Sequence, residues 1–168
     1  MMQSKTLLLA ALMSLAQARF GQEGAVQSII QALSNFGPPG AAGTLAGQTT
    51  GVLLAGANAC AKLELADEIV ATLGDDPEVI AGAAALVAAE KNFNPFAQSV
   101  PTICNNPALP ATPALRGIVP LVDPAVDGAD IQNANSAQSI QVALANNDGL
   151  SVADLSRAGG FDNFIDEA

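Results

Sequence analysis

The side chains of this 168-residue chain that could do chemistry are mainly carboxylates. There are 16 aspartates and glutamates against six lysines and arginines, and histidine, tyrosine and tryptophan are absent. Without histidine, the usual Ser-His-Asp and Cys-His catalytic sites are excluded, and so are histidine-ligated zinc and copper sites. The densest group of carboxylates consists of Glu64, Asp67, Glu68, Asp75, Asp76 and Glu78.

These six carboxylates allow two interpretations. The simpler one is a solvated helix face followed by a helix cap. The other is an acidic patch that binds a divalent cation or a basic polymer. Residues 127–130 and 146–149 resemble parts of calcium loops, but neither has the spacing of an EF-hand. We therefore predict neither a metal nor a cofactor.

A carboxylate-only enzyme, such as a glycoside hydrolase, needs two carboxylates roughly 5–10 Å apart in a cleft. The sequence does not indicate such a pair, and sugar-binding clefts usually contain Trp or Tyr. The chain also lacks the glycine-rich dinucleotide motif, the phosphate-binding P-loop and the G-x-S-x-G motif. We therefore predict a non-enzymatic protein without catalytic residues.

The chain has two cysteines, Cys60 and Cys104, and they lie 44 positions apart. In an exported protein two cysteines most simply form one disulfide. Closing a loop of this length stabilises the folded chain by about 4 kcal/mol in the chain-entropy model. The alternative is a pair of buried thiols.

Residues 1–18 have the order of an export signal: a positively charged start, a short apolar run and an Ala-Gln-Ala sequence that ends at Ala18. The apolar run is too short to span a bilayer. We therefore predict a secreted protein whose mature part, residues 19–168, is one helical domain without a membrane span. The formal charge of −10 argues against nucleic acids and anionic membranes as partners.

The spacing of apolar residues predicts an all-α fold, a small helical bundle. Residues 25–35 carry apolar side chains at i, i+3, i+4 and i+7, which is one face of a helix. Residues 62–73 and 77–91 predict two more helices, with Asp76 as the cap and Pro77 as the first residue of the second. Together with the disulfide, these two helices form a closed hairpin. The buried stripe of the second helix is expected to be Ile80, Ala83, Ala84 and Val87.

The segments around the hairpin are less regular. Residues 40–47 are expected to be a small-residue connector, and the next helix, from residue 50 or 51, could continue through Cys60. Five prolines between residues 92 and 113 rule out a continuous helix and predict an irregular wrap that leads to Cys104.

Towards the C-terminus the patterns are mixed. Residues 130–136 are expected to be a polar loop, and residues 139–145 fit either a helix or a strand, with a preference for helix. Ser151 and Asp154 resemble a capping box at the start of a short helix. We expect the phenylalanines of the last eight residues to fold back onto the core.

Phe93 and Phe96 flank a proline in the irregular segment. They either pack in the core or form an exposed apolar tip that contacts a hydrophobic surface or lipid.

Four stretches, residues 19–23, 30–37, 60–67 and 90–96, resemble small secreted proteins of filamentous ascomycete fungi. These are loosely labelled cell-wall or circumsporozoite-like proteins, and the resemblance runs along nearly the whole mature chain. It implies an extracellular or wall-associated location. The group carries no established activity, so the resemblance implies no functional residues.

We therefore expect a secreted, non-enzymatic fungal protein that acts at the surface or in the cell wall by binding or coating. Its partner would be a wall polymer or a hydrophobic surface. The alternative is an extracellular carrier that holds a small apolar, lipid-like ligand between its helices.

Overall fold

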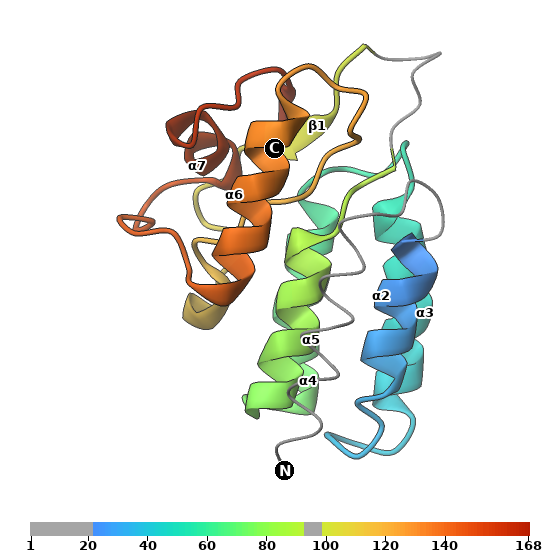
Figure 1. Cartoon of the computed structure of the whole chain (residues 1–168). Helices are drawn as coiled ribbons and strands as arrows, with labels where there is room; N and C mark the ends of the chain where they lie inside the picture. Colours follow the sequence, from blue (N-terminus) through green and yellow to red (C-terminus); the bar gives the residue numbers. More distant parts are fainter. Residues whose placement is uncertain (1–21, 93–98) are drawn as a thin grey trace.

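The computed structural model describes residues 22–92 and 99–168 (Figure 1). The predicted signal peptide, residues 1–18, and the side chains of Phe93 and Phe96 lie outside the described residues. The N-terminal half contains α2 (Gln22–Gln31), α3 (Ala41–Leu53), α4 (Ala61–Leu73) and α5 (Pro77–Ala88). Helix α2 packs on α3, α3 on α4, α4 on α5 and α5 on α2, so the four helices close into a ring. The prediction of a helical fold is confirmed.

Apolar side chains hold this ring together. All four residues of the stripe that the spacing predicts for the first helix are buried: Val26, Ile29, Ile30 and Leu33. Helix α5 is buried almost all round instead of along one stripe, and only Ile80 of its predicted stripe stays partly exposed. A Cβ atom on Gly82 would lie 2.9 Å from Leu33 Cδ1. The helices approach this closely because residue 82 has no side chain.

Helix α3 contradicts two expectations. Residues 40–47 are not a connector, because Gly40, with φ 82°, stands before a helix that begins at the next residue. The helix also does not continue through Cys60, since it ends at Leu53. After a turn, Asn58 Oδ1 accepts a hydrogen bond from Cys60 N at 2.7 Å and so precedes the start of α4.

Helices α4 and α5 form the predicted hairpin. The predicted cap of α5 is present, because Asp76 Oδ1 accepts a hydrogen bond from Glu78 N at 2.9 Å and Pro77 occupies the first helical position. Helix α5 ends three residues earlier than predicted, at Ala88. There the Ala88 carbonyl accepts a hydrogen bond from Leu121 N at 2.9 Å, so a contact far along the chain replaces further helix.

The C-terminal half contains β1 (Thr102–Cys104), a 3-10 turn η1 (Pro113–Leu115), α6 (Ala129–Gln141), α7 (Val152–Ala158) and β2 (Ile165–Glu167). Strands β1 and β2 pair in parallel, with Thr102 opposite Ile165 and Cys104 opposite Glu167. The all-α prediction lacks this small sheet. Each strand has only three residues, so neither shows the alternation that announces a strand in a sequence.

Helix α6 contains residues 130–136, so the prediction of a polar loop there was wrong. The buried face of this helix is itself polar and includes Gln132, Ser136 and Ser139. Gln132 Nε2 donates to Pro120 O at 2.8 Å and Ser139 Oγ accepts a hydrogen bond from Val119 N at 3.2 Å, so part of this face bonds to backbone. Such a helix shows no apolar period, which is why its pattern resembles a loop.

Residues 139–145, which fit either a helix or a strand, are helical up to Gln141, and residues 142–145 form neither a helix nor a strand. Helix α6 ends at Gln141, and Val142 is already extended, with φ −141°. Helix α7 then begins with the predicted capping box. Ser151 Oγ accepts a hydrogen bond from Asp154 N at 3.0 Å, and Asp154 Oδ2 accepts one from Ser151 N at 3.0 Å.

Buried apolar residues of both halves form one continuous core cluster. Phe161 and Phe164 belong to it, as predicted, with their ring centroids 5.6 Å apart. Among residues 22–92 and 99–168, none of the helices combines the length and the hydropathy that crossing a bilayer requires.

Candidate functional site

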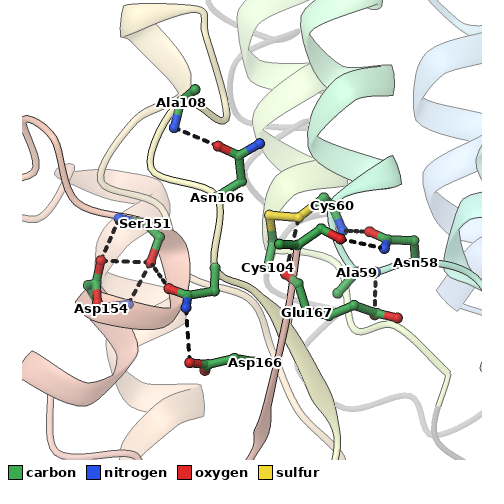
Figure 2. The surroundings of a disulfide bond; sticks show 12 residues. Asn58, Ala59, Cys60, Cys104, Asn106, Ala108, Ser151, Asp154, Asp166 and Glu167 are labelled. Carbon is green, nitrogen blue, oxygen red and sulfur yellow. Dashed lines mark hydrogen bonds between the residues drawn. A yellow bond between two sulfur atoms is a disulfide. The ribbon is translucent and has the colours of Figure 1, made fainter.

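The predicted disulfide joins the start of α4 to the end of β1 (Figure 2). The Cα atoms of Cys60 and Cys104 lie 4.7 Å apart and the sulfurs 2.00 Å. The exposed fractions of the two residues are 4% and 2%, so solvent barely reaches the sulfurs. The disulfide, predicted from the cysteine count, is confirmed, and it ties the ring of helices to the C-terminal half.

Next to the disulfide lies a buried lysine that our sequence reasoning missed. Lys62 is 4% exposed, and its Nζ donates hydrogen bonds to Val87 O at 2.9 Å and to Ala89 O at 2.5 Å. These carbonyls lie at the C-terminal end of α5, where the helix leaves carbonyls without internal partners and attracts a cation. The spacing of Lys62 in the sequence could have indicated its burial. It precedes the buried Ala66 and Ile69 by four and seven residues and therefore lies on the same helix face.

A second lysine, Lys91, lies close to Lys62 and to the disulfide. Lys91 is half-buried, and its Nζ donates to Ala55 O at 2.9 Å and to Thr102 Oγ1 at 3.0 Å. It thereby connects the turn after α3 with β1. Both lysine amines are therefore bonded to neutral oxygens of the protein.

The surroundings of the two amines shift their pKa values. Burial, followed by the positive charge of Lys91, lowers the pKa of Lys62 to about 7, although the charge of Glu90 acts in the opposite direction. Burial also lowers the pKa of Lys91, against the opposing charge of Glu167. Lys62 is therefore largely neutral just above neutral pH.

A neutral amine can act as a base or nucleophile if a substrate reaches it. Lys62, Lys91, Thr102 and Cys104 all line one small cavity of about 20 Å³. This volume holds about one water molecule, whereas ligand-binding pockets measure roughly 300–1,000 Å³. The arrangement therefore supports a structural role for the two amines.

The six candidate carboxylates fall into two groups. Glu64, Asp67 and Glu68 lie on α4, and Asp75, Asp76 and Glu78 lie at the turn into α5. Ten residues of helix, about 15 Å, separate Glu64 from this turn. In the part of the chain that the structure describes, no cluster of three or more Asp, Glu, His or Cys side chains could hold a metal ion. The six carboxylates are therefore better described as a solvated helix face followed by a helix cap than as one binding site.

Asp67 has a specific structural role. Its Oδ2 accepts a hydrogen bond from Ala111 N at 2.7 Å, and its Oδ1 accepts one from Thr112 N at 2.8 Å. The carboxylate thus fastens the proline-rich segment to the side of α4. Its neighbour Glu68 is exposed and makes no hydrogen bond or ion pair with any described residue.

We expect the substitution Asp67→Ala to lower the free energy of unfolding by about 1–3 kcal/mol, because it removes two hydrogen bonds to a charged acceptor. Urea unfolding monitored by circular dichroism measures this change. Glu68→Ala is the matched control and is expected to change the free energy by less than about 0.5 kcal/mol. Equal effects of the two substitutions would contradict the role of Asp67.

The described residues include four lysines and arginines, and the protein itself engages all of them. Lys62 and Lys91 donate to oxygens as described above, and Arg157 pairs with Asp166. Arg116 donates to the backbone carbonyls of Pro107, Pro110, Asn147 and Leu150. These cations therefore stabilise the fold and leave little positive charge to recognise an anionic partner.

Most large apolar side chains of the described residues are buried. The large ones that are exposed among the described residues are Leu54, Ile131, Val142 and Ile165. They come from three parts of the chain: Leu54 follows α3, Ile131 and Val142 lie in and directly after α6, and Ile165 lies in β2. Phe93 and Phe96 lie outside the described residues, so their role as an apolar contact stays a prediction.

No family model, curated protein or solved structure matches the chain.

Proposed function

We propose that the protein is a secreted fungal protein that acts at the cell surface or in the cell wall by binding or coating, without catalysis. The buried disulfide supports the location, because such bonds persist in oxidising compartments outside the cell. The signal-like residues 1–18 and the resemblance to fungal secreted proteins support the same location.

One observation supports the binding role: among the described residues, no free lysine or arginine balances the negative charge of the surface carboxylates. All lysines and arginines of the described part are engaged internally, as shown above. Eight carboxylates make no hydrogen bond or ion pair with described residues: Glu64, Glu68, Asp75, Glu78, Asp127, Asp130, Asp148 and Asp162. A surface with this charge attracts cationic polymers and repels anionic ones. The wall polymer of matching chemistry is a polysaccharide that carries protonated amino groups.

The alternative role, a carrier of a small apolar ligand, has less support. The cavity beside Lys62 has a volume of about 20 Å³, far below the roughly 300 Å³ of small ligand pockets. At Gly82, helix α5 also comes close to Leu33, which follows α2. Little room for a ligand is left between α5 and this part of the chain.

We expect the mature protein to be retained on beads of deacetylated chitin at low ionic strength and to be released by salt, because salt screens interactions between exposed charges. Parallel columns of chitin, glucan and hydrophobic beads test the other surfaces. Mass spectrometry of a lipid extract of the purified protein tests the carrier role.

The matched variant reverses three exposed charges: Glu64→Lys, Glu68→Lys and Asp75→Lys. We expect it to elute from the deacetylated chitin at a lower salt concentration than the unmodified protein. If the unmodified protein passes through all four columns, the binding role is wrong. A co-purifying lipid would instead favour the carrier.

A further inference from the structure

The last residues of the described chain lie directly beside the disulfide (Figure 2). Residues 165–168, which we call the C-terminal strap, pair with the segment that carries Cys104. Ile165 N donates to Pro101 O at 2.9 Å, and Asn105 N donates to Glu167 O at 2.7 Å. These two bonds flank β1 and hold residues 165–167 of the strap against it.

The other side of the strap contacts the segment that carries Cys60. Ala59 N donates to Glu167 Oε2 at 2.7 Å, and Asn58 Nδ2 donates to Ala168 O at 3.2 Å. The carbonyl oxygen of Glu167 lies only 3.3 Å from Cys60 Sγ. The strap therefore bridges the same two segments that the disulfide joins and lies against one of its sulfurs.

Partly exposed polar side chains also hold the strap in place. Asp166 forms an ion pair with Arg157 of α7, and its Oδ2 accepts a hydrogen bond from Asn105 Nδ2 at 3.0 Å. The Arg157 guanidinium also lies over the ring of Phe164, 4.7 Å from the ring centroid. Asp166 and Arg157 are 37% and 40% exposed, so these contacts can be broken without opening the core.

We infer that the C-terminal strap controls whether a thiol reductant can reach the Cys60–Cys104 disulfide. A reducing thiolate must contact one sulfur directly to attack it. Both cysteines are almost fully buried, and the Glu167 carbonyl places a partial negative charge beside Cys60 Sγ. The strap blocks this approach, so reduction has to follow its release.

The chemistry that the strap controls is a thiol–disulfide exchange with a dithiol. The thiolate of the dithiol attacks one protein sulfur, a mixed disulfide forms, and the other protein sulfur leaves as a thiolate. The second thiol of the dithiol then attacks the mixed disulfide and releases the first protein sulfur. The dithiol is oxidised to its own disulfide, and its two protons are taken up by the two protein thiolates.

The test measures how fast excess dithiothreitol reduces the folded protein, from the mass added when new thiols are alkylated. The strap variant is Asp166→Ala with Glu167→Ala. The charge-matched control is Glu68→Gln with Asp75→Asn, which also removes two exposed negative charges, but at positions 8 and 15 residues after Cys60 that make no contact with the strap. We expect reduction about tenfold faster in the strap variant, because it loses several anchoring hydrogen bonds, and a change within about twofold in the control.

A second measurement separates release of the strap from unfolding of the whole protein. Release exposes little surface, so we expect the reduction rate of the unmodified protein to change little at low urea concentrations, whereas global unfolding accelerates steeply with urea. A rate that rises with urea as global unfolding does would overturn the inference. Equal reduction rates in the strap variant and the control would overturn it as well.

Discussion

We expect the free energy of unfolding of this protein to rise as the pH is raised from about 7 towards 10.5. The cause is Lys62, whose pKa is lowered from 10.5 to about 7 in the folded protein. Between these values the unfolded chain binds a proton that the folded protein does not, so folding becomes more favourable with pH. Below about pH 7 Lys62 is protonated in both the folded and the unfolded state, and its contribution to the free energy of unfolding is absent.

The size of the effect follows from the same two values. The difference between 10.5 and about 7 corresponds to roughly 4–5 kcal/mol over the whole range if Lys62 acts alone. Burial lowers the pKa of Lys91 too, so its contribution has the same sign. Few other groups interfere, because the chain has no histidine or tyrosine and its two cysteines are bonded to each other.

Urea unfolding at a series of pH values from 7 to 10 tests this, with Lys62→Met as the variant. We expect the rise with pH to be mostly lost in the variant. At pH 10 the variant should be less stable by about 1–3 kcal/mol, because the carbonyls of Val87 and Ala89 lose their donor. Towards pH 7 the difference should shrink and then reverse, because the unmodified protein loses roughly 3–4 kcal/mol over this range and the variant has no buried amine to protonate. A rise with pH that is the same in both proteins would show that Lys62 is not its source.

We expect the variant with Cys60→Ala and Cys104→Ala to be less stable by about 4 kcal/mol. The disulfide closes a loop across a sequence separation of 44, and opening this loop gives the unfolded chain more freedom. The folded state still has another link between the same segments, because β2 contacts both Ala59 and Asn105. The variant is therefore expected to fold, with a lower urea midpoint.

Reduction of the unmodified protein, followed by the same urea measurement, is the matched control. If loop closure causes the stabilisation, the reduced protein and the alanine variant lose similar amounts. A loss below about 1 kcal/mol in both would mean that the strap and the core, and not the disulfide, hold the two halves together.

The features that could be predicted from the sequence depend on neighbouring residues. Apolar side chains at helical spacing predicted the buried face of α2, and Asp76 followed by Pro77 predicted the start of α5. Ser151 predicted the start of α7 for the same reason, since a capping side chain bonds to backbone only two or three residues away. The disulfide needed no geometry at all, because two cysteines allow only one pairing.

The features that only the tertiary structure decided depend on contacts between residues far apart in the sequence. Asp67 is recruited by backbone N–H groups 44 and 45 residues away, and Gln132 of α6 bonds to a carbonyl 12 residues before it. Lys62 is buried because the end of α5 offers it two carbonyls. A polar or charged side chain is buried only where such a partner exists, and the fold, not the local pattern, brings that partner close. For the same reason the sequence predicts the disulfide, whereas only the folded chain shows the strap that covers it.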